Sequence, residues 1–235
     1  MLGHMAFDGL AWLAAIIVGW RVRRTWLAQA GLPMPDRAYP LYIVIVWIGA
    51  IAAAVLLGSA NLALAGQDAS GRSILGAIAG GIATAEIYKR FRGISGSTGI
   101  VFVVPLALGI AIGRIGCFTA GIEDFTYGTP TALPWGVDFG DGIARHPVQL
   151  YESLAMAAFL AVFVPRLRRG DGVAIRCGFY FFAGWYAAQR FLWEFLKPYP
   201  PVVGPFNLFH LVCIAVLVYA GAMLALTREP ARAPA

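Results

Sequence analysis

The sequence predicts an all-α polytopic membrane protein with seven transmembrane helices, an external N-terminus and an internal C-terminus. Only 13% of its residues are charged, whereas soluble domains carry about 25%. Apolar runs recur along the chain, most of them close to the ~20 residues that cross a bilayer. Basic residues gather at the ends of these runs. We therefore expect residues 1–235 to form a single membrane domain, in which residues 113–146 form a small outer-face head between the fourth and fifth helices.

Seven segments are expected, and the longest connection between them is the head. The first is short for a membrane span. The segments are residues 7–20, 39–57, 73–88, 98–112, 147–164, 173–194 and 207–226. Glycines at mostly four- and five-residue spacing in and before the third segment predict a small-residue face for close helix packing. These are Gly71, Gly76, Gly80 and Gly81. An approach of the backbone to a lipid head group is the alternative.

The positive charges predict the orientation. With the N-terminus outside, thirteen of the eighteen Lys and Arg residues fall on the inner side, as the positive-inside rule requires. The inner residues are Arg21, Arg23, Arg24, Arg37, Lys89, Arg90, Arg92, Arg166, Arg168, Arg169, Arg176, Arg228 and Arg232. The outer side keeps Arg72, Arg114, Arg145, Arg190 and Lys197. This asymmetry accounts for the net charge of +6 without a nucleic-acid partner.

Two of the outer arginines lie at membrane depth. Arg114 directly follows the fourth apolar segment, and Arg190 lies inside the sixth, four residues before Glu194. Residues at that spacing share a helix face, so a structural ion pair between Arg190 and Glu194 is one interpretation. The other is that the arginines hold a phosphate, because the planar guanidinium makes paired bonds to phosphate oxygens. Charges at this depth are expensive and are functional candidates.

A second group of polar residues opens the fifth segment. Proline is favoured at the first helical position, so Arg145-His146-Pro147 places Arg145 and His146 at the mouth of a helix. Helix N-termini favour anions. We expect Arg145, Gln149 and Glu152, at positions i, i+4 and i+7, to form one polar face. His146 is a candidate catalytic residue because it lies among Arg, Gln, Tyr and Glu at one membrane surface.

The remaining polar features of the insert favour structural roles. Cys117 follows Arg114 by three residues, and a nearby cation favours the nucleophilic thiolate, but we expect an inert packed thiol. Cys177 and Cys213 lie in apolar runs and are expected to pack as small hydrophobic residues. Asp138 and Asp141 provide too few oxygens for calcium, which takes six to eight, so a solvated turn is predicted. At this point a phospholipid substrate is favoured, and a transporter or scramblase remains open.

Four motifs carry a resemblance to a known family. The chain reads GRIGCF at residues 113–118, PWGV at 134–137, RHPVQLYE at 145–152 and RFLWEF at 190–195. In this order and spacing, from about Leu75 to the C-terminus, the sequence resembles the prolipoprotein diacylglyceryl transferases. That family has seven helices, an external N-terminus and a periplasmic head. The resemblance therefore implies the same topology as the charges do.

The resemblance also implies an activity and a set of site residues. Such enzymes transfer the diacylglyceryl group of phosphatidylglycerol to the lipobox cysteine thiol in the signal peptide of a preprolipoprotein, at the outer face of the bacterial inner membrane. No metal or organic cofactor is required. The implied catalytic residues are Arg114, Arg190, Glu194 and His146. The implied substrate-binding residues are Arg145, Gln149, Tyr151, Glu152, Cys117 and Gly128.

The chain also departs from the family pattern. Where the family reads G-R-x-G-N-F-x-N-G-E, this sequence has Cys117 and Ala120 at the two asparagines and Ile122 at the glutamate. A family histidine near the third segment has no counterpart at Gly71-Arg72-Ser73. The alternative function is therefore a phospholipid-binding or lipid-translocating protein on the same scaffold without transferase activity. A third hypothesis gives Cys117 the role of nucleophile in a covalent acyl intermediate.

Overall fold

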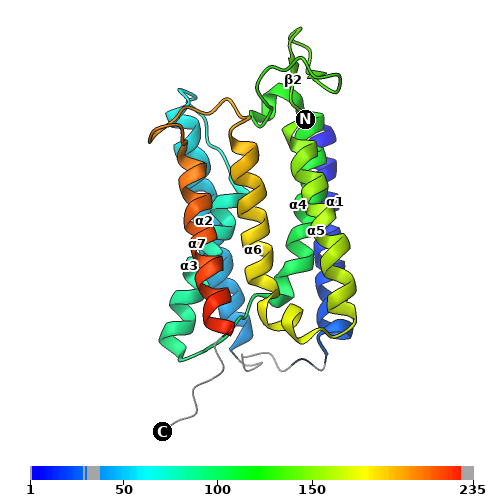
Figure 1. Ribbon diagram of the computed structural model, residues 1–235, viewed down its shortest axis with the longest axis vertical. Helices are drawn as coiled ribbons and strands as arrows, with labels where there is room; N and C mark the ends of the chain where they lie inside the picture. The colour runs from blue at the N-terminus through cyan, green and yellow to red at the C-terminus, as the bar shows by residue number, and fades with distance from the viewer. Residues whose placement is uncertain (1, 29, 31–37, 229–235) are drawn as a thin grey trace. The chain divides into compact units, whose positions relative to one another are not determined.

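The computed structural model describes residues 2–28, 30 and 38–228. Arg37 and Arg232, which entered the charge argument, lie outside these residues. The chain divides into two compact units. The first contains residues 1–29, 101–174 and 188–198, and the second contains residues 30–100, 175–187 and 199–235. The described residues form seven α-helices and almost no sheet (Figure 1), which confirms the predicted all-α class.

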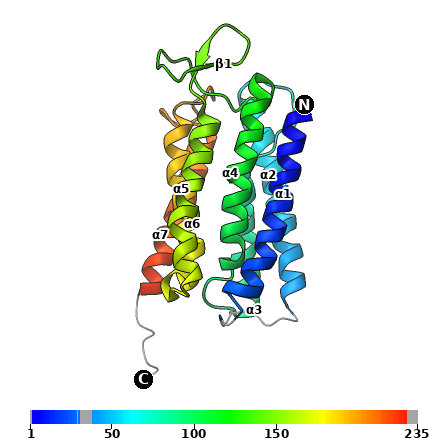
Figure 2. The ribbon, with the colours of Figure 1, turned by 90° about the vertical axis from the view of Figure 1, so that its right-hand side faces the viewer.

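The first unit is built from α1 (Leu2–Arg21), α4 (Ile100–Ala120), α5 (Val148–Arg168) and both ends of α6 (Gly172–Glu194). A π-helical turn, Val22–Trp26, extends α1. Helix α1 lies beside α4, where a Cβ at Gly19 would be 3.2 Å from Cγ of Pro105. The start of α1 lies at the same end of this unit as the head (Figure 2). This arrangement agrees with the expectation that the N-terminus and the head face the same side.

Helix α4 is longer than the sequence predicted. It continues through Arg114 and Cys117 to Ala120, so the first eight residues of the expected head, 113–120, are helical. The expected segment ended at residue 112, two residues before the first charge, Arg114. That charge does not end the helix because the Arg114 guanidinium is paired with a buried carboxylate.

The remainder of the head is a short 3-10 helix, Gly121–Asp124, and a small hairpin. Strand β1 (Val137–Asp138) pairs antiparallel with β2 (Ala144–Arg145), with Val137 opposite Arg145. Within the turn, Oδ1 of Asp138 accepts hydrogen bonds from the backbone N–H groups of residues 140, 141 and 142, at 2.8, 3.1 and 3.0 Å. The turn is exposed, as predicted, and the Asp138 carboxylate holds it together.

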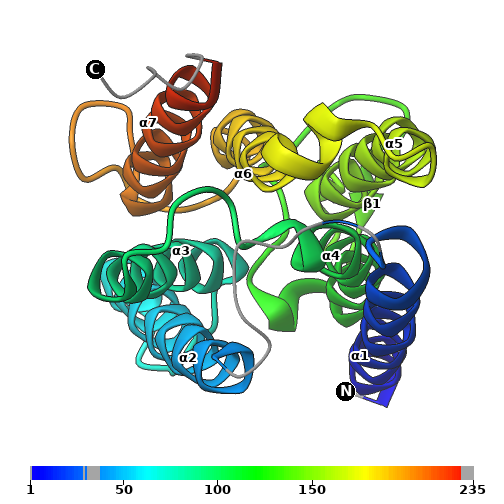
Figure 3. The ribbon, with the colours of Figure 1, turned by 90° about the horizontal axis from the view of Figure 1, so that it is seen from below.

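The second unit contains α2 (Tyr39–Leu64), α3 (Ile74–Arg92), the middle of α6 and α7 (Leu208–Arg228). Helices α2 and α3 lie side by side (Figure 3). A Cβ at Gly76 would be 2.6 Å from the carbonyl oxygen of Ala53, and one at Gly80 would be 2.4 Å from that of Gly49. The predicted small-residue face is therefore confirmed, and its function is helix packing.

Two neighbouring glycines of α3 give a matched test of this packing. Gly80→Ala places a methyl group against backbone that cannot yield, and overpacking of this kind costs about 1–3 kcal/mol. At Gly81 the nearest atoms to an added Cβ are 3.7 Å away, which is ordinary contact. We expect Gly80→Ala to lower the thermal stability of the detergent-solubilised protein and Gly81→Ala to leave it unchanged or raise it. Equal effects of the two variants would contradict close packing at Gly80.

Five of the helical stretches are long and apolar enough to cross a membrane: Met5–Trp26, Tyr39–Leu64, Ile100–Asp124, Val148–Arg168 and Leu208–Thr227. Helices α3 and α6 are less apolar than these five. Three basic residues and Glu86 crowd the end of α3, and α6 carries Arg176, Arg190 and Glu194. The protein is a multi-pass helical membrane protein.

Candidate functional site

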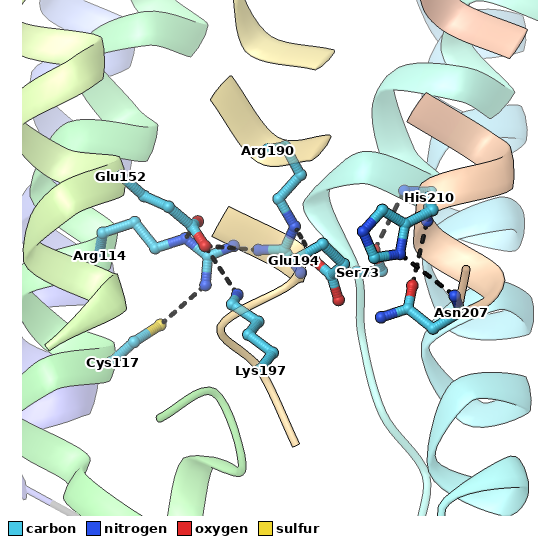
Figure 4. Close-up of polar contacts among 10 residues, drawn as sticks. Ser73, Arg114, Cys117, Glu152, Arg190, Glu194, Lys197, Asn207 and His210 are labelled. Carbon is cyan, nitrogen blue, oxygen red and sulfur yellow. Dashed lines mark hydrogen bonds and ion pairs between the residues drawn. The ribbon is translucent and has the colours of Figure 1, made fainter. Parts of the chain in front are cut away.

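Glu152 is the centre of a buried charge cluster in the first unit. Its side chain is fully buried. Three cations converge on it, one from α4, one from α6 and one from the segment that follows α6 (Figure 4). Nε of Arg114 lies 2.5 Å from Oε2. Nη1 of Arg190 and Nζ of Lys197 each lie 2.7 Å from Oε1. One carboxylate therefore has three cationic partners.

Arg190 has a second partner on its own helix. Its Nε lies 2.8 Å from Oε2 of Glu194, which is also buried. This confirms the predicted Arg190–Glu194 pair. The cluster contains three cations and two carboxylates, so its formal charge is 3 − 2 = +1. A net positive, desolvated group of this kind favours the binding of an anion.

Two hydrogen bonds between distant segments of the chain hold these residues together. Oγ of Ser153, next to Glu152 on α5, donates to the carbonyl oxygen of Ala111 at 2.7 Å. Since Ala111 lies one turn before Arg114 on α4, this bond sets Arg114 against Glu152. The backbone N–H of Thr129 donates to the carbonyl oxygen of Leu196 at 2.6 Å, which ties the head to the segment that carries Lys197.

Lys197 follows the end of α6 and lies outside its helical residues. Its side chain is fully buried. Burial, together with the positive charge of Arg190, lowers the pKa of Lys197 to about 8, although Glu152 opposes this change. An ordinary lysine has a pKa of about 10.4. Lys197 is thus the cation of the cluster whose proton is most easily lost.

Gln149 lies one turn before Glu152 on α5 and is fully buried. Neither its Nε2 nor its Oε1 has a hydrogen-bond partner among the described residues. Leaving such a group unpaired in the interior costs about 1–3 kcal/mol. A buried amide with spare donors and an acceptor is suited to a polar ligand.

His146 and Tyr151, two further predicted site residues, contact each other at the junction of the head and α5. Nδ1 of His146 lies 3.3 Å from the hydroxyl of Tyr151. The indole N–H of Trp135 donates to the same hydroxyl at 2.8 Å, and the Tyr151 ring contacts that of Trp193. These contacts fix Tyr151 between the head and α6.

The expected helical face of Arg145, Gln149 and Glu152 is wrong for Arg145. The structure places Arg145 in strand β2, where its guanidinium pairs with Asp141 and lies over the ring of Tyr127. The Arg145 guanidinium holds the pKa of Asp141 below its usual range. The cause of the error is Pro147, which caps the helix from outside it. The helical periodicity therefore begins only at Val148.

Gly128 has a structural role in the head. Its backbone N–H donates to the carbonyl oxygen of His146 at 3.1 Å, and a Cβ at Gly128 would be 2.4 Å from that oxygen. Only glycine allows this approach. The loop before the hairpin is thereby held against the start of α5.

This geometry predicts the effect of a single methyl group. Gly128→Ala should open the contact with His146 and reduce activity and stability, at a cost of about 1–3 kcal/mol. Gly113→Ala is the matched control, because nothing lies within 4 Å of a Cβ there. Thermal melting in detergent compares the stability of the two variants. A Gly128→Ala protein as stable as the Gly113→Ala protein would show that the loop is free to move.

Cys117 lies beside the cluster as part of α4. An Nη1–H group of Arg114 points to its Sγ at 3.9 Å, so the thiol contacts a guanidinium that Glu152 also holds. Cys177 and Cys213 are buried in the second unit, as predicted.

Three residues with notable side-chain contacts, Lys197, Asn207 and His210, were not among the predicted site residues. Lys197 was predicted only as an outer-side charge, and its position three residues after Glu194 was the available signal. In the second unit, Asn207 and His210 form a reciprocal pair at the start of α7. The backbone N–H of each donates to the side chain of the other, at 3.1 and 3.0 Å (Figure 4). This is the arrangement of a capping box.

The fold and the cluster define a class: a multi-pass helical membrane protein with a buried, net-positive charge cluster at the head end of its first unit. The chain belongs to the prolipoprotein diacylglyceryl transferase family, whose model matches residues 4–226.

Individual relatives are similar at modest identity. Three proteins named phosphatidylglycerol–prolipoprotein diacylglyceryl transferase illustrate this. The one from Finegoldia magna is 36% identical over 126 residues, which cover 53% of this chain and 48% of that protein. The one from Geobacter sulfurreducens is 28% identical over 233 residues, covering 90% and 87%. The one from Cupriavidus metallidurans is 39% identical over 104 residues, covering 41% and 36%.

Proposed function

We propose that this protein transfers the diacylglyceryl group of phosphatidylglycerol to the lipobox cysteine thiol of a preprolipoprotein signal peptide. We infer that it does so in the bacterial inner membrane, with seven spans, an external N-terminus and the site on the outer face. Residues 113–146 would form the outer head. Family membership and the names of the relatives support this reaction, and the charge cluster makes it chemically reasonable.

The proposed reaction breaks one bond and forms one. The thiol sulfur attacks the glyceryl carbon that carries the phosphate, a C–S bond forms, and the C–O bond to phosphate breaks. The phosphodiester carries one negative charge, and the glycerol phosphate that leaves carries two. The thiol proton is released. The site must therefore stabilise an additional negative charge on phosphate as the bond breaks.

The observation that carries the proposal is the convergence of Arg114, Arg190 and Lys197 on Glu152, with Glu194 behind Arg190. In this arrangement the carboxylates hold the guanidinium groups in place before substrate arrives, and guanidinium N–H groups match the oxygens of a phosphodiester. The Gln149 amide, one helical turn away, is available to a glycerol hydroxyl or a phosphate oxygen. His146, Tyr151, Arg145, Cys117 and Gly128 would shape the surroundings of the site.

The test is covalent transfer in vitro. Purified protein in vesicles that contain phosphatidylglycerol should add one diacylglyceryl mass to a lipobox peptide, as measured by mass spectrometry. A peptide with serine in place of the lipobox cysteine is the control and should remain unmodified. Binding or translocation of phosphatidylglycerol without any peptide product would instead support the non-catalytic alternative. That alternative is motivated by Cys117 and Ala120, which stand where the family pattern has asparagine. A mass adduct on the protein itself would support a covalent intermediate at Cys117.

A further inference from the structure

The proposed reaction requires a group that accepts the thiol proton. The thiolate is the nucleophile, and an acceptor near the site must take its proton before or during attack. The charge balance adds a second requirement. Since the phosphate gains one negative charge as the thiol loses one proton, a base within the cluster would keep the total charge of the site constant.

The charged groups that face Lys197 come from three helices. Arg114 on α4 and Arg190 on α6 stay protonated in proteins. Glu152 on α5 and Glu194 on α6 are each paired with guanidinium groups. Cys117 is a thiol in contact with Arg114. Outside this group, Asp124 in the 3-10 helix accepts a hydrogen bond from the hydroxyl of Thr126 at 2.6 Å.

Lys197 differs from all of these groups in its position and in how easily it loses its proton. It is fully buried, it lies beyond the helix end rather than within it, and its amine reaches the carboxylate that joins the two arginines. A neutral amine keeps two N–H groups, so it can still donate to Oε1 of Glu152 while its lone pair faces away. The two guanidinium groups already compensate the charges of Glu152 and Glu194. The cluster therefore tolerates the loss of the Lys197 proton.

We propose that Lys197 accepts the proton of the lipobox thiol, and that the resulting ammonium then stabilises the dianionic leaving phosphate. This inference rests on the proposed function. The amine lone pair takes the S–H proton, the sulfur electron pair forms the C–S bond, and the C–O electron pair leaves on phosphate. The site then holds one more positive charge on Lys197 and one more negative charge on phosphate. Release of glycerol phosphate and of the proton restores the initial state.

The pH dependence follows from the sign of this step. The neutral amine is the active form, so transfer should rise as pH increases and level off above the pKa of Lys197, near 8. Lys197→Arg keeps a positive charge that cannot be removed. We expect this variant to bind phosphatidylglycerol within about threefold of wild type and to transfer at least 100-fold more slowly at pH 8, since general base catalysis contributes about 10²–10⁴-fold. Its rate should also lack the inflection near 8.

A second variant and a second acceptor separate proton transfer from structure. Lys197→Met removes both the base and the charge, and it should also transfer slowly. A lipobox peptide with selenocysteine in place of cysteine is already ionised near neutral pH and needs no base. This acceptor should restore transfer by Lys197→Arg to within about tenfold of the wild-type rate.

The outcomes are distinguishable. If wild type modifies the peptide and Lys197→Arg does so equally well with the same pH profile, Lys197 is not the base and the proposed function stands. If Lys197→Arg is slow but selenocysteine gives no recovery, Lys197 has a structural role and the inference is wrong. If wild type modifies neither peptide, the proposed function fails and this inference fails with it. Phosphatidylglycerol binding by each variant shows that the site remains folded.

Discussion

Replacing Arg190 by alanine is expected to reduce diacylglyceryl transfer by at least 100-fold. Arg190 contacts both carboxylates of the cluster, at 2.7 Å from Glu152 and 2.8 Å from Glu194. Its loss therefore removes a cation from the site and also the group that connects the two carboxylates. Removal of one preorganised donor to a developing oxyanion costs about 10²–10³ in rate. Lipobox peptide modification, measured by mass spectrometry at fixed phosphatidylglycerol, gives the rate.

Two controls accompany this variant. Arg190→Lys keeps the charge but cannot reach both carboxylates with a planar fork, so an intermediate rate is expected. Arg169→Ala removes an exposed cation that follows α5 and should transfer as wild type does. If Arg190→Ala and Arg169→Ala have the same rate, the cluster is not the site of the reaction. Arg114→Ala should behave as Arg190→Ala does.

Replacing Glu152 by alanine is expected to damage folding as well as activity. Without this carboxylate, three cations remain buried with Glu194 alone, and the formal charge of the cluster rises from +1 to +2. Removal of one partner of a buried ion pair costs about 3–5 kcal/mol. We expect a clear loss of yield and thermal stability in detergent, and loss of transfer in the protein that remains.

Glu123→Gln is the matched control, because Glu123 is an exposed carboxylate of the head. It should leave stability and transfer unchanged. Glu152→Gln keeps the volume but removes the charge and replaces one acceptor oxygen with an N–H donor, so it should also be less stable than wild type. A Glu152→Ala protein with the stability of Glu123→Gln would show that the three cations do not depend on Glu152.

Local patterns predicted much of the fold and part of the site. The i, i+4 spacing of Arg190 and Glu194 fixes their contact on any helix, and the glycine spacing of α3 fixed its packing face. Both the ion pair and the packing face could therefore be predicted from the sequence. Arg114 and Glu152 were each identified as site candidates, one by its depth in the membrane and the other by its place in a polar helix start.

The rest depends on contacts between distant segments. Glu152 meets Arg114 because Ser153 is hydrogen-bonded to Ala111, and no spacing within the chain reveals that bond. Arg145 was misplaced because a proline near a helix start fits either the last position before the helix or the first within it. Lys197 lies in a proline-rich loop, and no spacing within that loop indicates that the structure buries its side chain against α5.

In the proposed reaction, glycerol phosphate leaves from the charge cluster as the lipobox thiol is alkylated. The most direct measurement follows both products in one reaction, with phosphatidylglycerol labelled in its head group and a lipobox peptide analysed by mass. One glycerol phosphate should appear for each diacylglyceryl thioether, and both products should be lost together in Arg190→Ala. Release of glycerol phosphate without peptide modification, or the absence of both products with wild-type protein, would contradict the proposed reaction.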